Sequence, residues 1–183
     1  MRPIREERLR AALINTSQRE RKALILPPGF GSLPRDGLDH LGWRDPKQPL
    51  VGYVFAELEN DVVGVLLRQA ERTPGTTAQC SWCEDVQLPN PVVFFSAKRP
   101  GAAGRNGDTV GVLICADSEC SRNVRKRPAM AYLGFDVEAA RQHRIERLRE
   151  HVTGSRGISR GPDAAESALV HAPRRRCPRR GRS

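Results

Sequence analysis

Cys80-Ser-Trp-Cys83 and Cys115-Ala-Asp-Ser-Glu-Cys120 are the two stretches that decide how this 183-residue chain folds. Each stretch holds two thiols a few residues apart, and 31 residues separate one pair from the other. Zinc binds cysteine as thiolate and prefers four tetrahedral ligands, which two close pairs supply. The sequence therefore predicts one structural Zn²⁺ bound by Cys80, Cys83, Cys115 and Cys120.

Other interpretations of the cysteines stay open. The thiols could be free and buried without a metal, or Cys80 and Cys83 could form a redox pair, although no βαβ pattern surrounds them. A catalytic zinc is not expected, because four thiolates leave no open coordination position. Cys177 lies between prolines and arginines near the C-terminus, and we assign it no role.

The segments around the cysteines predict a hairpin followed by a helix. Residues 92–95 and 110–114 are β-rich, and Asn106-Gly107 in the loop 100–108 favours a tight hairpin turn. The glycines of this loop could also form a phosphate cradle, but the loop joins two strands and no Lys-Ser/Thr follows. A short helix is expected over residues 118–126. The tight turn that carries Cys80 and Cys83, which we call the knuckle, is followed by a hairpin and then by the N-terminus of a helix. This order of elements is the layout of a treble-clef zinc finger.

The N-terminal segment predicts short helices and a second hairpin. Residues 5–26 have recurring leucines and a capping box at Ser17-x-x-Glu20. Residues 27–50 are rich in Pro, Gly and Asp, and we expect an ordered loop held by Trp43. The runs 51–58 and 62–68 are typical of paired strands. Trp43 and Trp82 are interpreted as packing residues, and the four scattered histidines as structural or exposed.

The expected fold class is α+β: a small treble-clef zinc finger with an N-terminal helix-plus-hairpin segment, a C-terminal amphipathic helix and a disordered basic tail. The corresponding boundaries are 1–77, 78–153 and 154–183. Asp136 should begin the helix at 136–152, whose stripe of Val137, Ala140, Ile145, Leu148 and Val152 is apolar. The tail has no periodicity and is rich in Gly, Ser, Pro and Arg.

Charge and hydrophobicity indicate which partners and which cellular location the sequence favours. The formal net charge is +10, but residues 154–183 hold eight arginines against Asp163 and Glu166, a net of +6, so the rest is only mildly basic. The tail could contact ribosomal RNA without sequence specificity, or it could have no role. No apolar run reaches the length of a membrane span or a signal peptide, which predicts a cytoplasmic protein in which disulfides are disfavoured.

The cysteine region resembles the C-terminal zinc-binding domain of the bacterial elongation-factor-G-binding proteins, the family that includes the FusB-type fusidic acid resistance proteins. The similar residues cover about 78–127: the Cys80 knuckle, Ser96 to Gly111 of the hairpin, and Ile114 to Arg125 around the second cysteine pair. Leu41-Gly-Trp43-Arg-Asp-Pro also resembles this group. The resistance proteins carry a longer N-terminal helical bundle than residues 1–77 provide.

The resemblance implies a non-enzymatic protein that binds elongation factor G and, in the resistance members, helps the factor leave a drug-stalled ribosome. Its zinc would be structural. We expect aromatic and basic residues near the cysteine pairs to form a single basic face that meets an acidic surface on the factor. Whichever of Phe94 and Phe95 faces inward is expected to belong to the core. The candidates are Phe94, Phe95, Lys98, Arg99, Arg105, Arg122, Arg125 and Lys126. The alternative is a zinc-finger module that binds RNA or the ribosome. A third hypothesis is a zinc-dependent nuclease or deaminase, but no activating Glu or His lies in register with the cysteines.

Overall fold

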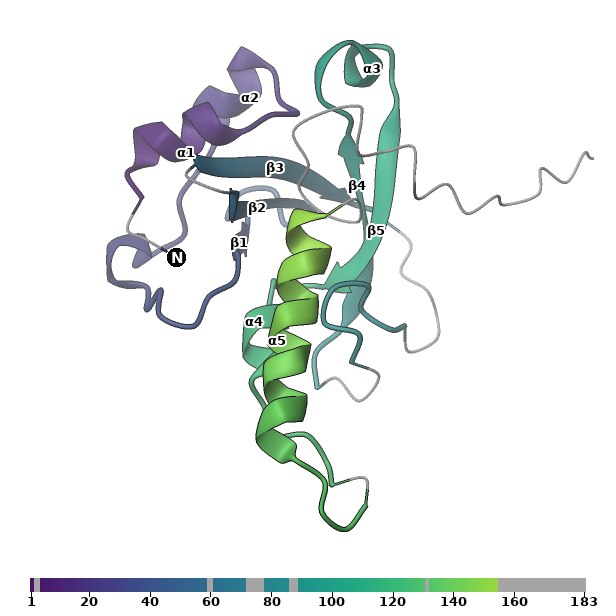
Figure 1. The fold of residues 1–183 in the computed structure, drawn as a ribbon. Coiled ribbons are helices and arrows are strands. Elements are labelled where there is room, and N and C mark those ends of the chain that lie inside the picture. The colour runs from purple at the N-terminus through teal and green to yellow at the C-terminus, as the bar shows by residue number, and fades with distance from the viewer. Residues whose placement is uncertain (2–3, 59–60, 72–77, 86–88, 131, 155–183) are drawn as a thin grey trace, which may run out of the picture.

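The computed structural model describes residues 1, 4–58, 61–71, 78–85, 89–130 and 132–154. Within them, five antiparallel strands form one sheet in the order β1-β2-β3-β4-β5. Helices cover both faces of the sheet (Figure 1). The elements are α1 (Glu6–Ala12), α2 (Gln18–Ala23), the 3₁₀ turn η1 (Phe30–Ser32), β1 (Leu41–Arg44), β2 (Val51–Leu58), β3 (Asp61–Gln69), β4 (Val92–Lys98), α3 (Gly101–Arg105), β5 (Thr109–Cys115), α4 (Cys120–Val124) and α5 (Val137–Thr153).

The β2–β3 hairpin is buried on both faces along most of its length, which explains why residues 51–56 and 62–67 are all apolar or glycine. On one face Tyr53 and Phe55 join a core with α1, β1 and Leu24, which follows α2, and on the other Val54 and Ala56 join a core with the cysteines and α5. An antiparallel strand that faced water on one side would alternate apolar and polar residues instead. These two strands therefore separate the two cores of the molecule and contribute side chains to both.

The N-terminal core is built around stacked aromatic rings. The ring centroids of Trp43 and Phe55 lie 5.4 Å apart at an interplanar angle of 13°, and the indole Nε1 donates to the Ile25 carbonyl at 2.9 Å. Phe55 in turn lies over Gly64 of β3, where an added Cβ would come within 2.3 Å of the ring. Gly64 therefore allows the close approach of the Phe55 ring to the sheet.

The N-terminal segment forms two helices, and the second begins where its sequence predicts. The Ser17 and Glu20 side chains form the expected capping box at the start of α2, and the prediction is confirmed. Arg10 of α1 donates to the carbonyls of Arg21, Lys22 and Leu24 at the C-terminal end of α2, at 2.7, 2.7 and 2.9 Å. This arginine satisfies carbonyls that a helix end leaves without partners.

Residues 27–50 contain more regular structure than the ordered loop that the sequence predicts. The segment includes η1 and the edge strand β1, in which Leu41 pairs with Phe55 and Trp43 with Tyr53. Trp43 does hold this segment in place, as expected. A four-residue strand offers only two alternating apolar positions, which is too short a pattern to recognise among prolines and glycines.

The turn between β4 and β5 also differs from the expected hairpin. Residues 101–105 form the single-turn helix α3 before the chain reverses. Gly107 adopts φ +96°, as its position in a turn requires, but Asn106 has φ −82° and ends the helix. Gly104 packs so closely on the Arg99 carbonyl that a Cβ would lie 1.8 Å from it, so the loop forms a compact helix instead of a two-residue turn.

Helix α5 packs on the sheet with its C-terminal half. Asp136 accepts hydrogen bonds from the amides of Glu138 and Ala139, so the predicted N-cap is confirmed. Ile145, Leu148 and Val152 of the predicted stripe are buried, whereas Val137 and Ala140 are only half-buried. None of the helices in the described residues has the length and hydrophobicity that a membrane crossing requires.

The sheet continues across the boundary expected at residue 77. β3 pairs with β4 through Arg68–Ser96 and Gln69–Phe95, and the Ala70 amide donates to the Phe94 carbonyl at 2.9 Å. Residues on both sides of that boundary also share a core. The disorder predicted for the tail concerns residues 155–183, which lie outside the described residues, as does Cys177.

Candidate metal centre

The four predicted ligands converge in one buried cluster. The ligand atoms of Cys80, Cys83, Cys115 and Cys120 all lie within 4.8 Å of one another. The Sγ atoms of Cys80 and Cys120 are 3.6 Å apart, and those of Cys83 and Cys115 are 3.7 Å apart. The side chains are at most 4% exposed. These separations are far longer than a disulfide bond of about 2.05 Å, so the sulfurs are free thiols.

The sulfur geometry fits a single tetrahedral zinc ion. A Zn–S bond of about 2.3 Å places the corners of a sulfur tetrahedron about 3.8 Å apart. The two measured separations lie close to this value. The four cysteines are therefore suited to bind one zinc ion, and such a site is closed because all four positions are taken by sulfur.

Two tight turns position the cysteine pairs. In the first, the Glu84 amide donates to the Cys80 carbonyl at 2.9 Å, and the Cys83 amide approaches the Cys80 sulfur at 3.5 Å. Glu84 and Ser118, one beside each pair, have φ values of 52° and 60°. Non-glycine residues adopt this conformation at a cost of the order of 1–3 kcal/mol, which the surrounding structure must offset. The turns are therefore held in place by the convergence of the cysteines.

The second cysteine pair is divided between two elements. The sequence placed both Cys115 and Cys120 at the start of a helix, but Cys115 is the last residue of β5 and only Cys120 lies in α4. α4 is shorter than the expected helix and ends at Val124. The site therefore joins the knuckle, a strand end and a helix start, and each element contributes to its geometry.

The sulfurs cannot all ionise without a metal. Hydrogen bonds with Cys115, Cys120 and Cys83 lower the pKa of the Cys80 thiol. Hydrogen bonds with Cys115, Cys80 and Cys83 raise the pKa of the Cys120 thiol instead. Four buried thiolates would repel one another strongly, so zinc must displace protons as it binds. Acidification should therefore favour the protonated, metal-free site.

Aromatic and histidine side chains pack around the knuckle. Trp82 is buried, and its carbonyl lies 3.0 Å from Nδ1 of the buried His151. His40 packs edge-on against the Trp82 ring at a centroid distance of 5.3 Å. Burial lowers the pKa of His40 to about 4, although Asp39 and Cys80 act in the opposite direction. His40 is therefore neutral at pH 7. The burial of His40 and His151 agrees with their interpretation as structural residues.

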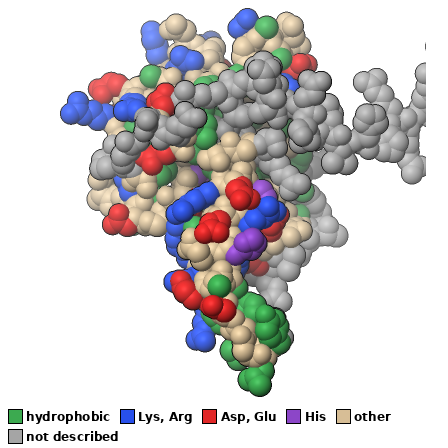
Figure 2. All heavy atoms as spheres, viewed as in Figure 1, with side chains coloured by type: hydrophobic (Ala, Val, Ile, Leu, Met, Phe, Trp, Pro, Cys, Tyr) green, Lys and Arg blue, Asp and Glu red, His purple; other side chains and the backbone are tan. Residues whose placement is uncertain are grey.

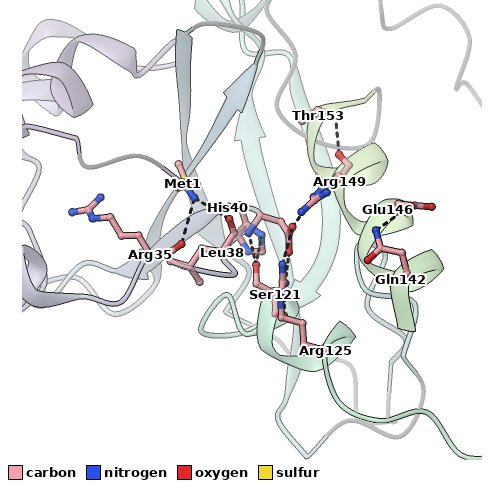
Figure 3. Close-up of polar contacts among 11 residues, drawn as sticks. Met1, Arg35, Leu38, His40, Ser121, Arg125, Gln142, Glu146, Arg149 and Thr153 are labelled. Atoms are coloured by element: carbon pink, nitrogen blue, oxygen red, sulfur yellow. Dashed lines mark hydrogen bonds and ion pairs between the residues drawn. The ribbon is translucent and has the colours of Figure 1, made fainter. Parts of the chain in front are cut away.

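Asp39 joins the N-terminal segment to α4 and α5. Figure 3 labels the residues that meet its carboxylate and amide, namely Ser121, Arg125 and Arg149. Its side chain is 1% exposed and accepts hydrogen bonds from Arg125 near the end of α4, at 2.5 and 3.2 Å, and from Arg149 of α5, at 2.9 Å. Its amide donates to the Ser121 hydroxyl at 3.1 Å. Burial acts to raise the pKa of Asp39, but the two arginines outweigh it and hold that pKa below its ordinary value. A lone aspartate in a loop gave no sequence signal for this contact.

Two of the residues predicted to bind a partner have structural roles instead. Phe95 faces inward and is 2% exposed, with the Arg44 guanidinium 5.4 Å from its ring centroid, so it is a core residue. Arg125 is engaged by Asp39 and by the Ser121 carbonyl. Phe94 is 40% exposed and lies on the opposite face of β4. Phe95 therefore lies in the core, and the Arg125 guanidinium is engaged in contacts within the protein.

The remaining basic candidates fall into two groups, not into the single face expected from sequence. Lys98, Arg99 and Arg105 lie around α3, whereas Arg122 and Lys126 lie on and just after α4. Figure 1 shows α3 and α4 at opposite ends of β4 and β5. Strands of seven residues span roughly 20 Å, which keeps the two groups apart.

The connection between α4 and α5 carries an exposed apolar group that was not among the predicted site residues. Met130, Tyr132 and Leu133 are 70%, 66% and 100% exposed. Figure 2 shows hydrophobic side chains gathered at the tip of the molecule to which this connection runs. The run Met130-Ala-Tyr-Leu-Gly-Phe135, which has no predicted element to pack into, is the signal that could have identified it.

Comparison with known proteins agrees with this architecture. Among solved structures, the fusidic acid resistance protein FusC is similar, with a TM-score of 0.51 and 19% sequence identity. The match covers 67% of this chain and 53% of that chain, so this protein spans about half the length of FusC, and the likeness shows the fold. No curated protein matches.

The family model described as the FBP C-terminal treble-clef zinc finger matches residues 8–155. The match extends well beyond residues 78–127 and the short stretch 41–46, where the resemblance was recognised, and includes most of α1, all of α2 and the β2–β3 hairpin. It confirms the expected α+β class with a treble-clef zinc finger. This protein therefore belongs to the FBP C-terminal treble-clef zinc-finger family.

Proposed function

We propose that this protein is a non-enzymatic translation accessory protein that binds elongation factor G and promotes its release from the ribosome, in the manner of fusidic acid resistance proteins. The observation that carries the proposal is the family match over residues 8–155, which includes all four cysteines of the zinc site. The similarity of the fold to fusidic acid resistance protein FusC supports it. This function requires a binding surface on the finger and no catalytic site.

The zinc site supports a structural role for the metal. Four sulfurs complete the coordination and the cluster is buried, so a metal-bound water would have no position to occupy. Lewis-acid and hydrolytic zinc enzymes need such an open position. In the proposed function zinc instead fixes α4 and the hairpin relative to one another, and the surface they carry makes the contact.

We assign the contact to the finger tip, which we define as Arg122, Lys126, Met130, Tyr132 and Leu133. Arg122 and Lys126 are exposed on and just after α4, and the three apolar side chains follow in the connection to α5. Protein interfaces usually have apolar or aromatic anchors surrounded by charged residues, and an exposed cluster of such anchors marks a contact site. The basic residues suit an acidic surface on the factor and would increase the rate of association.

Direct binding to purified elongation factor G tests the proposal, and the separation of the two basic groups provides a matched control. The finger-tip variant Arg122→Glu with Leu133→Ser should bind at least about tenfold more weakly, because anchors of this kind contribute more than about 1 kcal/mol each. The hairpin-tip variant Arg99→Glu with Arg105→Glu should bind as the parent does. Both variants change exposed or half-buried side chains and should retain zinc.

The possible outcomes distinguish whether the protein binds the factor from which of its surfaces makes the contact. No measurable binding of the parent protein to the factor, with or without ribosomes, would contradict the proposed function. Weaker binding by the hairpin-tip variant alone would keep the function and move the contact to the residues around α3. Measurements in the presence of nuclease address the alternative of an RNA-binding module, because retention through RNA would then disappear.

A further inference from the structure

Asn123 is a buried amide beside the metal centre. It lies in α4, one turn after Cys120, and is 0% exposed. Its Nδ2 atom is 3.5 Å from the Cys115 sulfur and 2.9 Å from Oδ1 of Asn90. Its Oδ1 atom accepts a hydrogen bond from the Lys126 ammonium at 2.9 Å. A side chain of the helix that carries one ligand therefore contacts the sulfur of another ligand, on a strand.

The neighbours of Asn123 determine which end of its amide faces the sulfur. The Lys126 ammonium can only donate hydrogen bonds, so the atom facing it must be the oxygen of Asn123. Asn90 donates its own amide to the Pro91 carbonyl at 3.4 Å, which turns the oxygen of Asn90 toward Asn123. Both neighbours therefore require the NH₂ group of Asn123 to point toward Asn90 and the Cys115 sulfur.

A donor in this position would stabilise a metal-bound thiolate. A zinc ion with four thiolates has a net charge of −2, which is costly in a buried site. An N–H group that donates to one sulfur withdraws part of that charge and fixes the orientation of the ligand. The Cys83 amide is placed at 3.5 Å from the Cys80 sulfur in the knuckle, and the side chain of Asn123 occupies the equivalent position for Cys115.

We propose that Asn123 is a positioning residue of the metal centre, which donates a hydrogen bond to the Cys115 thiolate and couples the ligand at the end of β5 to the ligand at the start of α4. Asn90 and Lys126 hold the amide in the required orientation. The residue then slows the release of zinc and lowers the electron density on one ligand. A purely structural buried amide would do neither.

The test uses Asn123→Leu, which keeps the branched shape and the number of side-chain heavy atoms and removes the donor. Zinc release to an excess of chelator should be at least about tenfold faster, in line with the loss of a contact to a metal ligand. In the Co²⁺-substituted protein, the sulfur-to-cobalt charge-transfer band should move to longer wavelength, because a thiolate without the hydrogen bond gives up an electron more easily. This band reports the ligand directly and does not follow stability.

Asn15→Leu is the matched control. Asn15 is also a buried amide, but it exchanges two hydrogen bonds of 2.9 Å with the backbone of Leu66 in the N-terminal core. This variant should be less stable and yet leave the cobalt band and the rate of zinc release unchanged. If Asn15→Leu shifts the band as Asn123→Leu does, the effect is one of general destabilisation and the proposal fails.

Lys126→Met keeps the proposal testable if Asn123→Leu does not fold. Lys126 is exposed, and its replacement removes the ammonium that orients the Asn123 amide. A smaller shift of the cobalt band in the same direction would support the proposal. An unchanged band in whichever of the two variants folds, together with a parental rate of zinc release, would overturn it.

Discussion

The two halves of this protein are stabilised by different means. The N-terminal half, which we define as α1, α2 and β1–β3, has an apolar core of leucines and stacked aromatic rings. The zinc-finger half, which comprises residues 78–85, β4, β5, α4 and α5, has the four buried cysteines in its core, and the turns beside them contain the strained residues Glu84 and Ser118. A small core of this kind is usually completed by a metal. The comparison indicates that the first half depends on packing and the second on zinc.

The two halves are joined by a shared pair of strands and by ion pairs. One face of β2 and β3 packs in the N-terminal core, and the other packs in the core that contains the cysteines. Asp39, in the segment before β1, forms ion pairs with Arg125 and Arg149 of the zinc-finger half. Loss of zinc should therefore disturb the finger first and the N-terminal half less. The two tryptophans, Trp43 in the N-terminal core and Trp82 in the knuckle, allow this order to be observed.

The largest effect is expected from Cys115→Ser. A structural zinc contributes about 10–16 kcal/mol of binding free energy that is coupled to folding, and loss of one ligand forfeits much of it. The finger half should lose its fixed structure. When Cys115→Ser is combined with Trp43→Phe, Trp82 is the remaining tryptophan, and its fluorescence should approach that of the unfolded chain. When Cys115→Ser is combined with Trp82→Phe, the remaining Trp43 should retain most of its native emission.

Removal of zinc from the parent protein by a chelator should reproduce this pattern, and added zinc should reverse it. Equal loss of both tryptophan signals would show that the halves unfold together. That result would contradict the division into a packing-dependent half and a metal-dependent half. Ser81, which neighbours the ligands without binding metal, provides the control through Ser81→Ala, which should retain zinc.

A smaller effect, confined to the N-terminal half, is expected from Gly64→Ala. The added Cβ would lie 2.3 Å from the Phe55 ring, so the ring or the strand must shift. Overpacking of this kind costs about 1–3 kcal/mol of unfolding free energy. Urea unfolding should show this loss, while the zinc content stays at that of the parent. Gly31→Ala, where an added Cβ meets nothing within 4 Å, should change stability little.

The smallest effect is expected from Asp39→Asn, which weakens the contact between the halves. Loss of charge-assisted hydrogen bonds to two arginines should cost about 1–2 kcal/mol at pH 7, since Arg125 and Arg149 are 28% and 58% exposed and water can solvate them. The pKa of Asp39 is lower in the folded protein than its ordinary value of 3.8. Its contribution is therefore complete above that value and is lost as the pH falls through the folded pKa.

Thermal unfolding of Asp39→Asn and the parent, with equal excess zinc from pH 7 to pH 3, tests this sign. The difference between the two proteins should be largest at neutral pH and should shrink below about pH 4 as Asp39 of the parent becomes protonated. A difference that grows on acidification would show that the aspartate does not stabilise the fold as a carboxylate.

Local patterns predicted much of the fold and the metal centre. Spacing alone identified the four ligands, because two close thiol pairs at these separations are a typical pattern of a zinc site. The capping box of α2, the N-cap Asp136 and the β2–β3 hairpin also depend only on neighbouring residues. Each of these features is determined within a few positions of the chain.

Features that depend on distant residues could not be predicted in this way. β1 becomes a strand because β2 offers it an edge, and Asp39 is buried because two arginines about 90 and 110 positions away meet it. The basic residues of the hairpin and of α4 flank the cysteines in sequence, yet the length of β4 and β5 keeps them apart. Asn123 had a recognisable signal, because it follows Cys120 at the i+3 spacing of one helical face.

X-ray absorption at the zinc edge tests the central claim most directly. The purified protein should contain one zinc ion per chain, with four sulfur neighbours at about 2.3 Å and no nitrogen or oxygen in the coordination sphere. A protein without zinc, or a spectrum that requires fewer than four sulfurs, would contradict the closed four-cysteine centre from which the account of the finger follows.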